Sequence, residues 1–244
     1  MAASEVGALI LAGGAGTRLR PMVSDVPKPM AAVGDRPFME YLLLQLGRDG
    51  FSDVIVCAGF MADHLQAYFG DGSHWGMTIR YSIETEPRGT AGAIKLAEAL
   101  LRDDRWLIMN GDSFFDISLR DLVAQHEQSP ALISMALAPA GDPGRYGGVS
   151  LTPEGVISEF VEKSAGSTVR WINAGIYVAE RAVLDLIPAG RSVSLERDVL
   201  PSLAGIHLRG FAQDGYFVDI GVPADYLRVR DEPGPLRSLI GEVR

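Results

Sequence analysis

The first half of the chain alternates short apolar runs with longer stretches in which apolar residues recur at helical spacing. Runs of aliphatic and β-branched residues are typical of buried strands, and each stretch between them is long enough for one crossover helix. This alternation predicts βαβ units around a parallel sheet. The expected strands are residues 6–11, 54–58, 78–83 and 106–109, and the expected helices are residues 38–48, 62–69 and 91–101.

The pattern changes after about residue 130, where the apolar runs become shorter and less regular. The turn sequence Pro153-Glu154-Gly155 joins two of these runs, so we expect this half to be partly antiparallel. The tail at 232–235, with its Pro and Gly residues, is expected to end the regular structure. The expected strands are residues 132–137, 148–152 and 156–161, and the expected helices are residues 181–187, 195–203 and 224–230.

These elements predict an α/β fold with a Rossmann-like open sheet, mixed but mainly parallel, flanked by helices and carrying a smaller lobe. No repeat, low-complexity segment or long linker divides the sequence. We therefore expect residues 1–244 to form a single domain, with one half at about 1–130 and the other at about 131–231.

Composition and charge limit the kinds of partner. Acidic residues outnumber basic ones by 31 to 22, and the formal net charge is −9. Such a chain is not expected to bind nucleic acid, and an anionic ligand must meet a local positive cluster. The single cysteine, Cys57, lies in an apolar run and is expected in a buried strand. No run approaches the roughly 18 apolar residues of a membrane span, so we expect no membrane contact and a cytoplasmic location.

A glycine-rich loop follows the first expected strand. Gly13, Gly14 and Gly16 let successive backbone N–H groups converge on an anion at the carboxyl end of that strand, an arrangement typical of phosphate sites. The loop lacks the Gly-Lys-Ser/Thr of a Walker A motif, and Leu19 stands where a dinucleotide fingerprint has its third glycine. For the glycines alone, a simple turn with no role in ligand binding remains an alternative.

Two basic residues, Arg18 and Lys28, flank this loop and favour phosphate binding over a simple turn. The chain has only three lysines against nineteen arginines, so a retained lysine suggests a need for a compact ammonium group. Lys28 stands between two prolines and is expected to place its charge at a reacting phosphate. Lys95 lies in an expected helix and is interpreted as a surface charge.

The loop is the first of several motifs that cover nearly the whole chain in order. They are the glycine loop with Arg18 and Pro21, Pro27-Lys28-Pro29, Glu86 to Gly92, Asn110-Gly111-Asp112, Glu162-Lys163, Asn173-Ala174-Gly175 and Val218 to Gly221. This series resembles the signature of the sugar-1-phosphate nucleotidylyltransferases. The resemblance implies an enzyme of the EC 2.7.7 type, which joins a sugar 1-phosphate to a nucleoside triphosphate and releases pyrophosphate.

The resemblance assigns catalysis to Arg18, Lys28 and Asp112. If the nucleotide base is guanine, it presents N1–H and an amino group as donors. A carboxylate or main-chain carbonyls near the end of the strand at 78–83 would then be expected to accept them. Glu86 is one candidate, with main-chain carbonyls as the alternative. The residues expected to bind the nucleotide are Leu11, Ala12, Gly13, Gly14, Gly16, Thr17, Arg18, Glu86, Pro87, Gly89, Thr90 and Asp112.

Asp112 and Asp219 each follow a short apolar run, which places both carboxylates where strands open onto a ligand crevice. Mg²⁺ takes one or two protein carboxylates and fills its other positions with phosphate oxygens and water. The resemblance implies that both aspartates bind this metal. The alternatives are a turn residue for Asp112 and the start of a helix for Asp219.

The second half is expected to be the sugar-binding lobe. The resemblance implies that Glu162 and Lys163 contact the sugar and its phosphate, with Asn173 beside them. Gly147 would let the backbone approach a flat sugar ring. From the residues alone, the Glu-Lys pair is equally well explained as a solvated strand end.

Three segments, residues 36–43, 86–94 and 194–199, look most like the D-glycero-α-D-manno-heptose 1-phosphate guanylyltransferases. This resemblance implies GTP and a manno-configured heptose 1-phosphate as substrates, in NDP-sugar biosynthesis for cell-surface polysaccharides. A short uridylyltransferase for N-acetylmuramic acid 1-phosphate or glucose 1-phosphate is the alternative enzyme. A catalytically silent sugar-nucleotide-binding protein is the alternative of another class, and it would be expected to lack Lys28 or Asp112.

Overall fold

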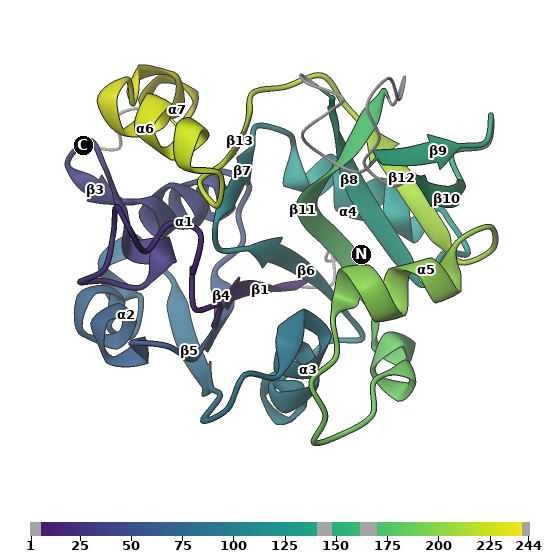
Figure 1. Ribbon diagram of the computed structural model, residues 1–244. Coiled ribbons are helices and arrows are strands. Elements are labelled where there is room, and N and C mark those ends of the chain that lie inside the picture. Colours follow the sequence, from purple (N-terminus) through teal and green to yellow (C-terminus); the bar gives the residue numbers. More distant parts are fainter. Residues whose placement is uncertain (1–5, 141–147, 162–169, 241–244) are drawn as a thin grey trace.

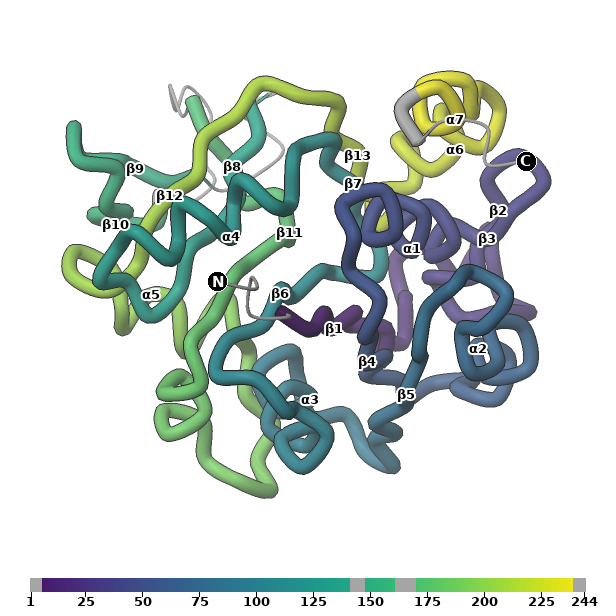
Figure 2. Tube along the Cα trace, turned by 180° about the vertical axis from the view of Figure 1, so that it is seen from behind, coloured from purple at the N-terminus to yellow at the C-terminus, as the bar shows by residue number. Residues whose placement is uncertain are grey.

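The computed structural model describes residues 6–140, 148–161 and 170–240. Within these residues nine strands form one main sheet, and two pairs of shorter strands lie apart from it. Figure 1 shows the two halves of the chain on either side of β1 and β6, and Figure 2 shows the same arrangement from behind. The expected α/β fold, with a mixed and mainly parallel sheet flanked by helices, is confirmed.

Four parallel strands of the first half form one side of this sheet, in the order β6-β1-β4-β5 with β5 at the edge. The short apolar runs predicted all four within one residue at either end. The helices at 38–48 and 62–69 are also confirmed, whereas the third ends earlier and continues as a 3₁₀ turn. The elements are β1 (Gly7–Ala12), α1 (Phe38–Arg48), β4 (Asp53–Ala58), α2 (Ala62–Phe69), β5 (Thr78–Ile83), α3 (Gly89–Leu96) and β6 (Arg105–Asn110).

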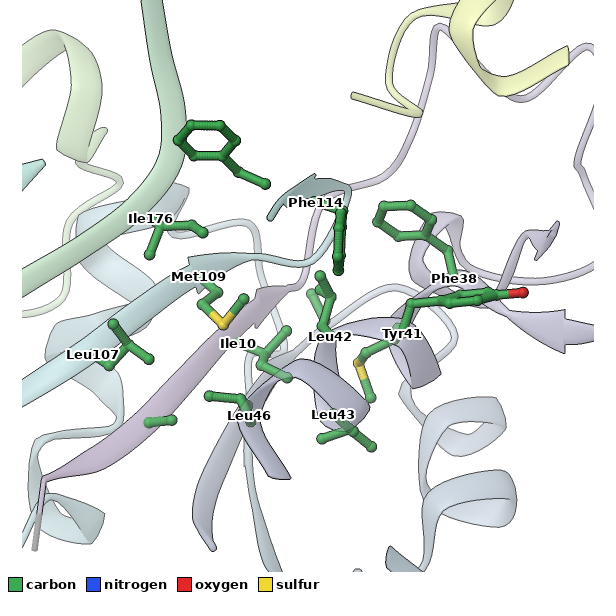
Figure 3. Close-up of a cluster of buried hydrophobic side chains, with 14 of the residues drawn as sticks. Ile10, Phe38, Tyr41, Leu42, Leu43, Leu46, Leu107, Met109, Phe114 and Ile176 are labelled. Atoms are coloured by element: carbon green, nitrogen blue, oxygen red, sulfur yellow. The ribbon is translucent and has the colours of Figure 1, made fainter. Parts of the chain in front are cut away.

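Helices cover both faces of the sheet. Successive residues of a strand point to opposite faces, so neighbouring residues of β1 pack against different helices. Ile10 of β1 lies in a cluster with Leu42 and Leu46 of α1, and Figure 3 shows these side chains directed toward one another. Leu9, its neighbour on β1, lies in the opposite cluster with Ile94 of α3. Both strand residues are fully buried, so the apolar run of β1 is explained by burial on two faces.

The second half extends the same sheet, since β11 (Trp171–Glu180) pairs antiparallel with β6. The expected antiparallel character is therefore confirmed, and β9 and β10 form the hairpin predicted around Gly155. Two short strands, β7 and β13, pair with each other beside the sheet and bring residues 113 and 219 opposite each other. The further strands are β7 (Ser113–Phe115), β8 (Ile133–Pro139), β9 (Gly148–Leu151), β10 (Ile157–Val161), β12 (Leu208–Ala212) and β13 (Phe217–Asp219).

The helices that follow β7 depart from expectation in three places. The helix expected at 181–187 is a 3₁₀ segment over Arg181–Leu186. The one at 195–203 divides into a π segment, Leu195–Val199, and α5 (Leu200–Leu203), with Pro201 in the first turn of α5. The sequence did not predict α4 (Leu119–Glu127), in which only three of nine residues are buried.

The expected end of regular structure at 232–235 is wrong, because α7 (Gly234–Ile240) follows α6 (Pro223–Asp231). Pro235 is the second residue of α7, where its missing N–H costs no helix hydrogen bond. Leu236 is fully buried. α7 contacts α1, and α6 contacts the short strand β2 (Ala32–Val33), which pairs with β3 (Arg36–Pro37) (Figures 1 and 2). The C-terminal helices thus return to the first half of the chain.

The helices of the described part of the chain are short or carry polar residues. None of its helices combines the length and the apolar character needed to cross a lipid bilayer.

Candidate active site

The glycine-rich loop leaves β1 at Ala12 and turns back at Gly16. Gly16 has a φ of +60°, a backbone conformation that other residues rarely adopt, and its carbonyl accepts hydrogen bonds from the N–H groups of Leu19 and Arg20 at 2.9 and 3.1 Å. A methyl group added at Gly16 would lie 3.1 Å from the Cβ of Lys28. The glycine therefore allows the loop to pack directly against the lysine that the sequence analysis singled out.

A cavity of about 550 Å³ lies between this loop, the segment after β5 and the end of β6. Lys28 lines it together with most of the residues expected to bind the nucleotide. Thr17 and Arg18 are exposed and do not line it. The expected residues that line the cavity are Leu11, Ala12, Gly13, Gly14, Gly16, Glu86, Pro87, Gly89, Thr90 and Asp112.

Lys28 forms an ion pair with Asp112 at one end of the cavity. Lys28 begins a 3₁₀ turn, Lys28–Met30, and its side chain is only 13% exposed. Asp112 follows β6, and its side chain is 28% exposed. An ammonium group held this far out of water, beside a cavity lined by backbone glycines, can attract a phosphate strongly because the surroundings screen its charge less than water does.

Asp219 lies next to this ion pair, because its backbone pairs with Ser113 across β13 and β7. Burial and the charge of Asp112 raise the pKa of the Asp219 carboxyl to about 6. The hydrogen bond from the Gly221 N–H and the charges of Lys28 and Arg18 lower the pKa, but by less. The Gly221 N–H donates to Asp219 Oδ1 at 2.7 Å. Two carboxylates are therefore held close together in a partly buried place.

Gly221 shows how tightly these charged groups converge. A methyl group added there would lie 2.7 Å from Lys28 Nζ, 2.8 Å from Asp219 Oδ1 and 3.3 Å from Arg18 Nη2. The structure thus brings together four residues that lie up to 201 positions apart in the sequence: Arg18, Lys28, Asp112 and Asp219. Only Gly can occupy position 221 without moving this group.

The donor set of the site fits a magnesium ion that is bound together with phosphate. Among the described residues no group of three or more His, Cys, Asp or Glu side chains could hold a metal alone. The pair Asp112 and Asp219 supplies the one or two carboxylates that Mg²⁺ takes from proteins, and substrate phosphates and water complete its octahedron. Burial and the neighbouring charge of Asp112 raise the pKa of Asp219, so holding both carboxylates ionised is unfavourable. A bound cation would offset this repulsion between the two carboxylates.

Glu84, rather than Glu86, is the carboxylate that the fold holds in the cavity wall. It directly follows β5, its Oε2 accepts the Arg88 N–H at 3.0 Å, and burial raises its pKa. A methyl group added at Gly13 would lie 2.6 Å from Glu84 Oε1, so the glycine loop contacts this carboxylate. Glu86 also lines the cavity but is exposed. Glu84 was not among the residues predicted from the sequence, although its place immediately after a strand was a usable signal.

The expected sugar-binding residues are only partly described. Gly147, Glu162 and Lys163 lie outside the described residues. Asn173 is the third residue of β11. Its amide donates from Nδ2 to the Tyr177 hydroxyl at 2.7 Å, and its Oδ1 accepts the Gly175 N–H at 2.9 Å. Asn173 is therefore held in one orientation.

Cys57 lies near the end of β4 and is buried, as expected. Burial, with a smaller contribution from Glu84, raises the pKa of its thiol to about 12. A protonated, inaccessible thiol cannot serve as a nucleophile.

Comparison with known proteins identifies relatives of this chain. The family model described as nucleotidyl transferase matches residues 7–232. Among solved structures, HddC from Yersinia pseudotuberculosis complexed with GMP-PN has a TM-score of 0.82 and 28% sequence identity, covering 93% of this chain and 99% of that one.

Two curated relatives act on different sugar phosphates. The chain is 38% identical over 226 residues to the D-glycero-alpha-D-manno-heptose 1-phosphate guanylyltransferase of Aneurinibacillus thermoaerophilus, covering 92% of this chain and 97% of the relative. It is 38% identical over 231 residues to the mannose-1-phosphate guanylyltransferase of Mycobacterium tuberculosis. The match covers 93% of this chain but only 64% of that relative, so the chain spans less than two thirds of the mycobacterial protein.

Proposed function

Because this chain belongs to the nucleotidyl transferase family, we propose that it transfers the guanylyl group of GTP to a sugar 1-phosphate and releases pyrophosphate. The observation that carries this proposal is the convergence of Lys28, Asp112, Asp219 and Arg18 beside the glycine-lined cavity. A protein that only binds a sugar nucleotide would not need a lysine beside two carboxylates able to hold a metal ion. The relatives with guanylyltransferase names support the same activity.

In this proposal the two halves bind different substrates. The triphosphate lies along the glycine loop, and the sugar 1-phosphate enters from the side of Asn173. Gly147, Glu162 and Lys163, which lie outside the described residues, are proposed to hold the sugar and its phosphate. Residues 1–244 would act as one domain, in the cytoplasm.

The reaction needs no protein nucleophile. A phosphate oxygen of the sugar 1-phosphate attacks the α-phosphorus of GTP, the bond to the β-phosphate oxygen breaks, and pyrophosphate leaves. The attacking phosphate is already ionised at neutral pH, so the protein's task is to align two polyanions and reduce their repulsion. Lys28 and Arg18 supply positive charge at the reacting phosphates, and Asp112 and Asp219 would hold Mg²⁺, which when bound neutralises further phosphate charge.

Glu84 supports guanine as the base. Guanine offers two neighbouring donors, N1–H and the amino group, and a carboxylate can accept both. Uracil and thymine offer a single N–H between two carbonyl acceptors, which a carboxylate would repel. The partly buried position of Glu84, with Oε2 also held by the Arg88 N–H, keeps its oxygens fixed for this role. Glu86, which is exposed, is the less suitable acceptor.

The heptose relative supports a manno-configured heptose 1-phosphate as the sugar substrate. Mannose 1-phosphate is the second candidate, since the mycobacterial relative is equally similar in sequence. A matrix of four nucleoside triphosphates against heptose, mannose, glucose and N-acetylmuramic acid 1-phosphates, with pyrophosphate release as the readout, tests both points. We expect release only with GTP, and most rapidly with the heptose 1-phosphate. A preference for UTP or dTTP would refute the guanylyl assignment.

A further inference from the structure

A segment of the second half caps the helix that borders the nucleotide cavity. The Val193 carbonyl accepts the N–H groups of Ala91 and Gly92, in the first turn of α3, at 3.0 and 3.1 Å, and the Val193 N–H donates to the Arg88 carbonyl at 2.8 Å. These N–H groups would otherwise be the free donors of a helix start. The first turn of α3 therefore depends on a segment about 100 residues away in the sequence.

Glu196 continues this contact to a residue that lines the cavity. Its Oε2 accepts the Thr90 hydroxyl at 2.7 Å and the Ser194 hydroxyl at 3.0 Å, while Thr90 Oγ1 accepts the Leu195 N–H at 2.7 Å. The Thr90 hydroxyl is thus both a donor and an acceptor within the protein. These bonds fix the rotamer of a side chain in the nucleotide cavity.

The other oxygen of Glu196 is linked through Tyr177 to Asn173. Glu196 Oε1 accepts the Tyr177 hydroxyl at 3.5 Å, the longest link, and the Tyr177 oxygen accepts the Asn173 Nδ2 group at 2.7 Å. Tyr177 is fully buried. Burial and the charge of Glu196 raise its pKa, so the phenol stays protonated and remains a donor. One carboxylate thereby connects Thr90 with Asn173.

We propose that Glu196 is a positioning residue that couples the two substrate sites, fixing Thr90 on the nucleotide side and, through Tyr177, Asn173 on the sugar side. This inference rests on the proposed function, because it takes the Thr90 side as the GTP site and the Asn173 side as the sugar 1-phosphate site. Glu196 is not among the residues that line the cavity, so its proposed role is indirect. Its effect is on the orientation of Thr90 and Asn173.

Three substitutions separate this role from a merely structural one. Glu196→Gln replaces one acceptor oxygen by a donor and should raise KM for both substrates about tenfold, the loss expected when a charged hydrogen bond is broken. Thr90→Val should raise KM mainly for GTP, and Tyr177→Phe mainly for the sugar 1-phosphate. Glu98→Gln is the control, because Glu98, just after α3, pairs with Lys95, is not part of these hydrogen bonds and does not line the cavity. It should leave both KM values unchanged.

Steady-state kinetics with each substrate varied, together with melting temperatures, provide the test. Because Glu196 acts on Asn173 through Tyr177, the Tyr177→Phe, Glu196→Gln double variant should have the same KM for the sugar 1-phosphate as Tyr177→Phe alone. Additive effects, or a fall in melting temperature and kcat with both KM values unchanged, would overturn the proposal. If Glu196→Gln does not fold, equal effects of Thr90→Val and of Tyr177→Phe on both KM values would also overturn it. An inactive wild-type protein would instead refute the proposed function.

Discussion

Asp219→Asn should stabilise the metal-free protein while removing its activity. Burial and the nearby charge of Asp112 raise the pKa of Asp219 to about 6, so the folded protein holds the charged form at a cost. Asparagine keeps an oxygen that can accept the Gly221 N–H, but it carries no charge. The substitution thus removes the unfavourable charge with little change of shape.

The direction of the pH effect follows from which state binds the proton more tightly. The Asp219 carboxyl ionises near 3.8 when unfolded and near 6 when folded, so between these values the folded protein binds more protons. Raising the pH through this range therefore lowers wild-type stability, and above about pH 6 the loss is constant. The difference between the two pKa values of Asp219 corresponds to roughly 3 kcal/mol, which we take as an upper bound.

Thermal unfolding in EDTA at pH 4, 6 and 7.5 measures this effect. We expect Asp219→Asn to match the wild type near pH 4 and to melt up to roughly 6–12 °C higher at pH 7.5. Asp214→Asn is the control, because Asp214 is exposed, and it should show no pH-dependent gain. A destabilised Asp219→Asn variant, or a difference that does not change with pH, would refute the electrostatic reasoning.

Other substitutions address the remaining parts of the site. Lys28→Met should lower kcat at least a hundredfold while the circular dichroism spectrum and melting temperature stay close to those of the wild type, since its ammonium stabilises charge at the reacting phosphate; near-normal turnover would contradict this role. EDTA should abolish pyrophosphate release and Mg²⁺ should restore it, whereas Asp112→Asn should need far more Mg²⁺ for half-maximal activity; full activity in EDTA would exclude the metal role. Glu84→Gln should lower kcat/KM for GTP at least tenfold more than Glu86→Gln does, because Gln offers one acceptor where guanine needs two; equal effects would exclude Glu84 as the base-reading residue.

Apolar patterning was sufficient for the parallel core of the sheet. Burial on two faces requires apolar residues along β1 and along the buried parts of β4 and β6, so each strand contains an uninterrupted apolar run. The pattern failed where an element is mostly exposed, as in α4. It failed again at α7, because proline starts a helix as readily as it ends one, and only the packing of Leu236 decides between the two.

The site was predictable where motifs are continuous in sequence. The glycine loop, Lys28 and the two aspartates carry their signal in neighbouring residues, and the structure brings all of them together. The bond between Thr90 and Glu196 joins residues 106 positions apart, and no local pattern indicates such a contact. Glu84 was missed for a different reason, since the next acidic residue, Glu86, lay inside the more conspicuous motif.

Identification of the product tests the central proposal most directly. The wild-type protein and Lys28→Met would be incubated with GTP, Mg²⁺ and D-glycero-α-D-manno-heptose 1-phosphate, and the products analysed by mass spectrometry and ³¹P nuclear magnetic resonance. We predict equal amounts of GDP-heptose and pyrophosphate with the wild type and almost none with Lys28→Met. Release of inorganic phosphate or GDP without a sugar nucleotide, or equal product from both proteins, would contradict guanylyl transfer at this site.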